Sequence, residues 1–238
     1  MGIFGSKPGK ALAPRPALEQ AAAGEPEGPM AGLATDLAQR LLDVGIDGRG
    51  PFRSAHAVAD AARDGARSDE GAITSIVRTH AVEAGVGGFV TGLGGFVTLL
   101  VALPANVVEF YLLATRMVAS IARVRGYDID HPQIRSAILL TLVGADADDL
   151  LRKAGVVVSG GVGGKLTDLA TQRLPGPALM VLNKGIGFRL LTRSGQSMLG
   201  RFGKAVPVVG GAVGAGLDVY LLGRIAANAK REFPRRAS

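Results

Sequence analysis

Residues 84–126 read AGVGGFVTGLGGFVTLLVALPANVVEFYLLATRMVASIARVRG, and the fold is organised around them. The 25 residues from Ala84 to Val108 carry no charge, and Glu83 and Glu109 bound them. As one α-helix they would be about 37 Å long, more than the roughly 30 Å of a bilayer's hydrocarbon core. Each interior glycine, however, destabilises a water-exposed helix by about 1 kcal/mol relative to alanine. The stretch therefore favours helices that pack closely in lipid or in protein.

Glycines at four-residue spacing occur in this stretch and again near the C-terminus. Small residues at that spacing let two helix backbones approach closely, which is how helices associate where no water drives them together. We therefore assign to membrane or helix packing the glycines Gly88, Gly92, Gly95, Gly210 and Gly214.

Pro104 is predicted to divide the stretch into two helices, because proline is tolerated in the first turn of a helix and disrupts its interior. We expect a hairpin of one helix over residues 86–102 and a second over residues 104–125. Gly126 is predicted to end the second helix, since glycine readily takes the left-handed conformation that follows many helices.

Three charged residues of the second predicted helix share one face, because Glu109, Arg116 and Arg123 are seven residues apart. This face could line a polar groove, or its side chains could pair within the protein. We favour a simpler interpretation, in which the face is an edge turned toward solvent or lipid headgroups.

Amphipathic helices are predicted before the hairpin from the helical spacing of apolar residues. They cover residues 31–44, 52–67 and 69–83, and Ser68 is a plausible N-cap for the third. His56 and His80 fall on these helices without metal-ligand spacing nearby. We interpret both as ordinary helix-surface histidines.

After the hairpin, Asp130 is predicted to cap a helix, and the last helix is predicted to run from about Ala212 to Phe233. The expected fold is an all-α multi-helix bundle with glycine-rich apolar helical hairpins and no sheet. We divide the chain into a flexible Ala/Pro/Gly-rich tail, an amphipathic helical lead-in, a main helical domain and a basic tail: residues 1–30, 31–69, 70–234 and 235–238.

The net charge of +7 is concentrated near the C-terminus, where residues 181–238 carry ten basic and two acidic side chains. Such a region suits an anionic partner, either lipid headgroups or nucleic acid. The basic residues alternate with apolar glycine runs rather than with aromatic residues on which bases could stack. We therefore expect no nucleic-acid partner.

Catalytic and metal-binding motifs are missing from the sequence. There is no cysteine, and no serine lies in a G-x-S-x-G motif. Residues 160–165, GGVGGK, lack a glycine and a hydroxyl residue that a phosphate-binding loop needs, because Ser159 and Leu166 occupy those positions. The cluster Asp146, Asp148 and Asp149 fits the first turn of a helix better than a cation site. We expect no enzyme activity, cofactor or metal.

Several short motifs, in order and spacing, resemble those of the EcsC family of bacterial proteins over roughly residues 70–234. The matching residues are Gly92-Leu93-Gly94-Gly95-Phe96, Leu103-Pro104-Ala105, Gly126-Tyr127-Asp128, Asn183-Lys184, Gly187-Phe188-Arg189-Leu190-Leu191, Gly203-Lys204, Pro207, Gly210, Gly211 and Asp218. Many family members carry an acidic residue just before Leu-Pro, whereas this chain has Ala102. This chain therefore has no carboxylate at that point.

The resemblance implies a helical, hydrophobic, membrane-associated protein named after an operon that also encodes an ABC transporter. It implies no reaction and no catalytic residue. Polar residues that border apolar segments are the natural candidates for contact with a ligand or partner, because a charge there needs a partner or water. These candidates are Glu109, Arg116, Tyr127, Asp128, Asn183, Lys184, Phe188, Arg189 and Asp218.

The expected function is that of a membrane-associated, non-catalytic helical protein that binds anionic lipids or a membrane protein. By family resemblance it could be accessory to an ABC transporter. It is expected at the cytoplasmic side of the cell membrane, either peripheral or inserted by its hairpin. The alternative is a soluble, cytoplasmic protein-interaction domain whose glycines pack its core. The sequence does not indicate an oligomeric state.

Overall fold

Every regular element that the computed structural model describes is a helix. It describes residues 29–50, 52–93, 95–144, 147, 150–151, 179, 182–187, 189–190 and 207–236. No strand occurs within these ranges, so the predicted all-α fold is confirmed. The long helices are α2 (Pro29–Gly45), α3 (Ala55–Asp64), α4 (Asp69–Leu93), α5 (Gly95–Val124), α6 (Pro132–Val143) and α10 (Pro207–Glu232).

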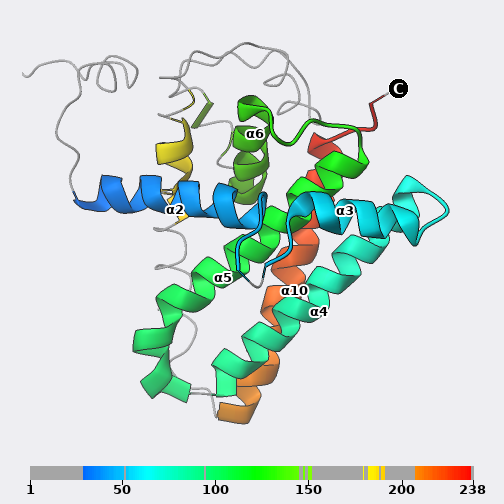
Figure 1. The fold of residues 1–238 in the computed structure, drawn as a ribbon. Helices are drawn as coiled ribbons and strands as arrows, with labels where there is room; N and C mark the ends of the chain where they lie inside the picture. Colours follow the sequence, from blue (N-terminus) through cyan, green and yellow to red (C-terminus); the bar gives the residue numbers. More distant parts are fainter. Residues whose placement is uncertain are drawn as a thin grey trace, which may run out of the picture.

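The helix α5 lies at the centre of the fold and contacts α2, α3, α4, α6 and α10. Figure 1 shows α4, α5 and α10 as three long helices, with α2, α3 and α6 gathered around one end of this group. The α4–α5 hairpin is antiparallel, and α10 runs beside α4 in the opposite direction. The last helix of the chain thus completes the bundle that the hairpin begins.

Local sequence chemistry explains where several helices begin and end. As predicted, Ser68 precedes α4, and its hydroxyl oxygen accepts a hydrogen bond from the Gly71 amide at 3.2 Å. Gly126 follows α5 with a φ of +88°, as predicted. Its amide donates to the Arg123 carbonyl at 2.9 Å, and the Tyr127 amide donates to the Ala122 carbonyl at 3.1 Å. These two bonds form a Schellman motif, which satisfies carbonyls at the helix end.

The hairpin itself differs from the prediction, because its two helices meet near residue 94 rather than at Pro104. The helix α4 continues from Asp69 to Leu93, and α5 includes Pro104 in its interior. A proline inside a long helix removes one backbone hydrogen bond and can be accommodated by a local bend.

Three smaller boundaries also differ from the prediction. The N-cap of α6 is His131 rather than Asp130. The first turn of α10 begins at Pro207 instead of Ala212, which agrees with the preference of proline for the first helical position. Finally, α2 begins at Pro29, so the last two residues assigned to the tail are helical; residues 1–28 lie outside the described part of the chain.

The lead-in predicted for residues 31–69 packs into the same core as the central helices. Leu41, Ile46 and Ala55 are fully buried together with Met117 of α5. The crossing of α2 and α5 is close: a Cβ atom at Gly45 would lie 2.8 Å from the Thr115 Cβ atom. Glycine at this position therefore permits the two backbones to approach.

The glycines predicted to pack helices lie on the backbones of α4, α5 and α10. The surroundings of Gly88, Gly92, Gly95, Gly210 and Gly214 lie outside the described side-chain environments, so their packing role stays a prediction. Over the part of the chain that the structure describes, no helix combines the length and apolar composition needed to cross a membrane.

Candidate functional site

A buried polar cluster joins α4 to α5. His80 is 1% exposed and Arg116 is 7% exposed, and the Arg116 Nε atom donates a hydrogen bond to His80 Nε2 at 3.0 Å. The same guanidinium forms an ion pair with Glu83, and it lies 6.0 Å from the centre of the Phe52 ring. One arginine of α5 therefore contacts two residues of α4 and one residue of the segment between α2 and α3.

Hydrogen bonding defines the protonation state of His80. Its Nδ1 atom lies 2.8 Å from the Ile76 carbonyl oxygen, and its Nε2 atom accepts from Arg116. The proton must therefore be on Nδ1, and the ring is neutral. Burial lowers the pKa of His80, and the nearby Arg116 charge lowers it further, while the Ile76 hydrogen bond and Glu83 act in the opposite direction.

This geometry corrects two predictions. His80 is not a helix-surface histidine, because both ring nitrogens are engaged inside the protein. The stripe of Glu109, Arg116 and Arg123 is not one solvent-facing edge either. Arg116 is buried, and Arg123 forms a two-pronged ion pair with Asp60 of α3 at 3.1 and 3.2 Å. The other interpretation of this face, that its charges pair within the protein, is correct for Arg116 and Arg123.

A second polar feature pairs α5 with α10, where Glu109 lies near Asp218. Asp218 is partly buried, and Glu109 is exposed. Burial raises the pKa of Asp218 from 3.8 to about 6, and the negative charge of Glu109 contributes to the increase. Two of the predicted candidates are thus brought together from positions more than a hundred residues apart. The pair can take up a proton in mildly acidic conditions.

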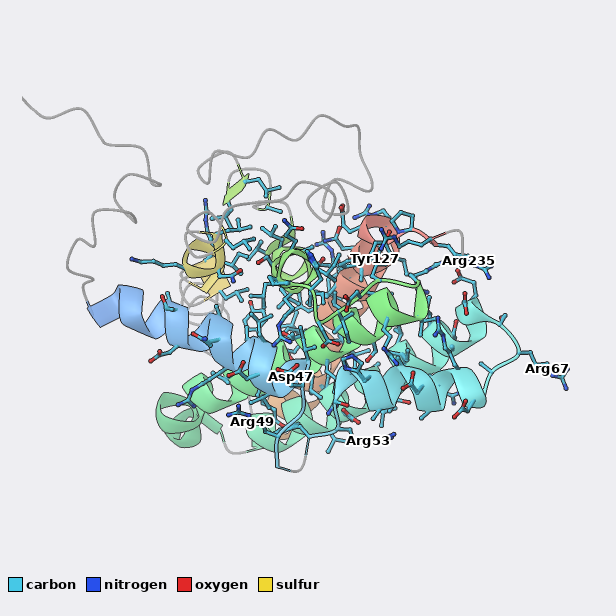
Figure 2. All side chains as sticks on the ribbon, turned by 45° about the horizontal axis from the view of Figure 1, so that its top comes forward. Asp47, Arg49, Arg53, Arg67, Tyr127 and Arg235 are labelled. Atoms are coloured by element: carbon cyan, nitrogen blue, oxygen red, sulfur yellow. The ribbon has the colours of Figure 1, made fainter. Side chains whose placement is uncertain are left out.

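The structure gives Tyr127 a structural role at the end of the molecule where α5 and α10 finish (Figure 2). Its hydroxyl donates to the Pro234 carbonyl at 2.9 Å, and its ring packs edge-on against Phe233. The Arg236 guanidinium lies 5.1 Å from the centre of the Tyr127 ring. Tyr127 therefore holds the C-terminal segment against the end of α5.

The remaining candidates lie elsewhere. Asp128 is exposed, and its side chain accepts from the Asp130 amide within a turn. Asn183 accepts a hydrogen bond from Ser136 of α6 at 3.0 Å. Lys184 and Arg189 are partly buried on the neighbouring helical turns, while Phe188 lies outside the described residues.

The nine predicted candidates therefore do not form one site. Arg116 pairs with His80 and Glu83, and Glu109 lies near Asp218, which is the one pairing described above that joins two of the candidates. His80 and Glu83 could not be recognised as partners of Arg116 from the sequence, because Arg116 is 36 positions from His80 and no local pattern connects them. Within the described ranges, no cluster of His, Asp and Glu could hold a metal ion. Asp146, Asp148 and Asp149 fall outside those ranges.

The geometry of His80 bears on what this residue could do chemically. A general base needs a nitrogen or oxygen free to accept a proton from a substrate, and both nitrogens of His80 already have partners. Comparisons with family models, with curated proteins and with solved structures find no match to the chain. The resemblance to the EcsC family therefore stays a prediction.

Proposed function

We propose that this is a non-catalytic membrane-binding protein that inserts one apolar end of its helical bundle into a single leaflet. The observation that carries the proposal is the meeting of three uncharged helical segments at that end. They are residues 84–93 of α4, residues 95–108 of α5 and residues 207–217 of α10. Figure 1 shows the end of α4 and the starts of α5 and α10 together at the lower end of the molecule.

Their lengths suit insertion to half the depth of a bilayer. At 1.5 Å per residue, the segments of α4 and α10 are about 15 Å long and that of α5 is about 21 Å long. The hydrocarbon core of one leaflet is about 15 Å thick, half of the roughly 30 Å of the whole core. We call these three segments the apolar end. A helical hairpin keeps its backbone hydrogen bonds within each helix, which makes burial in lipid feasible.

Charged residues mark the border of the apolar end. Glu109 follows the uncharged segment of α5, and Asp218 follows that of α10. The partly buried Asp218 carboxyl has a pKa of about 6, so its protonation would ease the approach of this border to lipid. This arrangement supports an insertion that stops where the carboxylates begin.

The resemblance to the EcsC family supports the same function. We propose a location at the cytoplasmic side of the cell membrane, with anionic lipids or a membrane protein such as a transporter as partners. The excess of basic residues in positions 181–238 supports an anionic surface, since each basic residue near such a surface contributes about 1 kcal/mol. The proposal assigns no reaction and no cofactor.

Cell fractionation tests this function. Membranes from cells that express the protein would be washed first with high salt, then with alkaline carbonate, and finally with detergent. We expect the protein to remain in the pellet until detergent is added, because its apolar end lies in hydrocarbon. Release by salt alone, or recovery in the soluble fraction, would refute insertion.

A charge at the apolar end provides a sharper comparison. Leu93→Glu places a carboxylate at the end of α4, whereas Gln39→Glu places one on the exposed surface of α2. We expect the first variant to be released by carbonate and the second to behave as the wild type. Circular dichroism of both purified proteins would show whether the helices remain formed.

A further inference from the structure

The helices α4 and α10 lie side by side, and each has an exposed face beside their contact. We call these two exposed faces the outer side of the α4–α10 pair. The two helices are antiparallel, and they face each other at Gly85 and Val219, where a Cβ atom at Gly85 would lie 3.4 Å from Val219 Cγ2. Residues three and four positions apart share a face of a helix. Val82 and Val86, four positions apart, therefore share one exposed face of α4. In two antiparallel right-handed helices, one step past the contact (Val86 after Gly85, and Tyr220 after Val219) turns toward the same side of the pair, so Tyr220 lies on the side of Val82 and Val86.

Large apolar side chains are exposed on this surface. Val82 is 62% exposed, Val86 is 60% exposed and Tyr220 is 60% exposed. Lying beside the contact between Gly85 and Val219, they continue the apolar end toward the middle of the bundle. A soluble protein can expose single apolar residues without consequence, but a cluster adjoining an apolar segment indicates contact with another apolar phase.

Basic residues follow these apolar residues in the direction away from the apolar end. Arg78 lies four positions before Val82, and Arg224 lies four positions after Tyr220. Both are exposed, and among the described residues neither forms an ion pair or a side-chain hydrogen bond. The positions that share a face with Val82 (residues 71–86) and with Tyr220 (residues 216–231) include no Asp or Glu. Glu83, three positions before Val86, is paired with Arg116, so the charge left unpaired on this surface, that of Arg78 and Arg224, is positive.

The order along the surface is apolar residues, then tyrosine, then arginine. Membrane proteins show this order across the lipid interface, where tyrosine lies at headgroup depth and long basic side chains reach the phosphates. We propose that the outer side of α4 and α10 is the lipid-facing side of the protein. Val86 contacts the upper acyl region, Val82 and Tyr220 lie at the border between acyl chains and headgroups, and Arg78 and Arg224 bind the phosphates of anionic phospholipids. This inference rests on the proposed insertion of the apolar end.

Charge favours lipid over a second copy of the chain. In a symmetric dimer formed through this surface, the same patch of each subunit meets its counterpart, so positive charge would meet positive charge. An anionic leaflet instead offers a negative partner for both arginines. The tests below therefore also detect association of the protein with a second copy of itself.

The first test measures binding to lipid vesicles. The purified full-length protein would be titrated with vesicles of phosphatidylcholine alone and with an equal mixture of phosphatidylcholine and phosphatidylglycerol. The test variant is Arg78→Gln/Arg224→Gln, and the matched control is Arg49→Gln/Arg67→Gln. The control residues are exposed and lie outside the proposed surface, and the net charge falls equally in both variants (Figure 2).

We expect the test variant to lose about 30-fold in affinity for the anionic vesicles, from about fivefold per arginine, while its affinity for phosphatidylcholine stays unchanged. The control is expected to lose less than threefold. Equal losses in the two variants, or none in the test variant, would overturn the inference and leave the membrane function standing. If the wild type binds neither kind of vesicle, the proposed function itself fails.

The second test locates the surface directly. The chain has no tryptophan, so a tryptophan introduced by Tyr220→Trp would be its only one, and Gln39→Trp on α2 is the matched control. We expect the first fluorophore to shift to shorter wavelength on addition of vesicles and to be quenched by brominated acyl chains. The second should not change.

An unchanged spectrum for Tyr220→Trp in a protein that does bind the vesicles would place the lipid contact elsewhere. A shift that occurs without lipid and grows with protein concentration would identify a second copy as the occupant. Either result overturns the inference.

Discussion

Replacing Asp218 by asparagine is expected to stabilise the protein at neutral pH. The variant Asp218→Asn keeps the shape of the side chain and removes a charge that the folded protein disfavours. Burial, assisted by Glu109, raises the pKa of this carboxyl from 3.8 to about 6. The folded state therefore binds a proton more tightly than the unfolded state, and the stability of the wild type should fall as the pH rises through this range.

The size of the effect follows from the pKa. An increase from 3.8 to about 6 corresponds to about 3 kcal/mol, at 1.36 kcal/mol for each tenfold change in the acid constant. Because Asp218 is only partly buried, screening by solvent reduces this to about 1–2 kcal/mol. For a chain of this length, that gain raises the melting temperature by about 2–8 °C.

Thermal unfolding followed by circular dichroism would measure the gain at about pH 7.5 and about pH 4, the two sides of the titration. We expect Asp218→Asn to exceed the wild type at the higher pH and to match it at the lower pH. Glu109→Gln should give a smaller gain, since burial is the larger cause. Asp36→Asn, an exposed carboxyl on α2, is the control. The reasoning is refuted if Asp218→Asn is no more stable than the wild type at the higher pH.

Three further changes test the packing. The pKa of His80 is lowered in the folded protein, so the wild type should lose stability as the pH falls below about 6.5. His80→Gln keeps an acceptor for Arg116 but cannot be protonated, so its free energy of unfolding, measured with urea, should fall less over the same pH range. Gly45→Val should destabilise by about 1–3 kcal/mol in the same assay, because its side chain would collide with Thr115, whereas Gly32→Val on the same helix meets nothing within 4 Å. Tyr127→Phe removes the hydrogen bond to Pro234 and should lower stability by about 1 kcal/mol and speed proteolysis at the C-terminus; unchanged cleavage would contradict its role as a clamp.

Features that depend on neighbouring residues could be predicted from the sequence. The start of α4 after Ser68 and the end of α5 at Gly126 follow from one cap and one left-handed glycine. The all-α class follows from helical spacing of apolar residues over most of the chain. The point at which the two helices of the hairpin meet was less predictable. The helix α5 continues through Pro104, and its packing against five other helices supports it there.

The polar pairings could not be predicted, because they join residues that are far apart in the chain. Glu109, Arg116 and Asp218 were all candidates, but nothing in the local pattern of α5 indicates that His80 will accept from Arg116. For the same reason, the stripe on α5 suggested one exposed edge, whereas each of its arginines has a partner on a different helix. Sequence spacing identifies a face of a helix, and only tertiary packing decides what that face meets.

The contact between Gly85 and Val219 also has a consequence for protein synthesis. These residues are 134 positions apart, so α4 leaves the ribosome long before α10 has been made. At translation rates of about 5–20 residues per second, the delay is on the order of 10 s. During that interval the side of the nascent α4 that α10 later covers is available to chaperones or to a membrane targeting factor. The order of synthesis thus gives the cell a period in which to deliver the unfinished bundle to lipid.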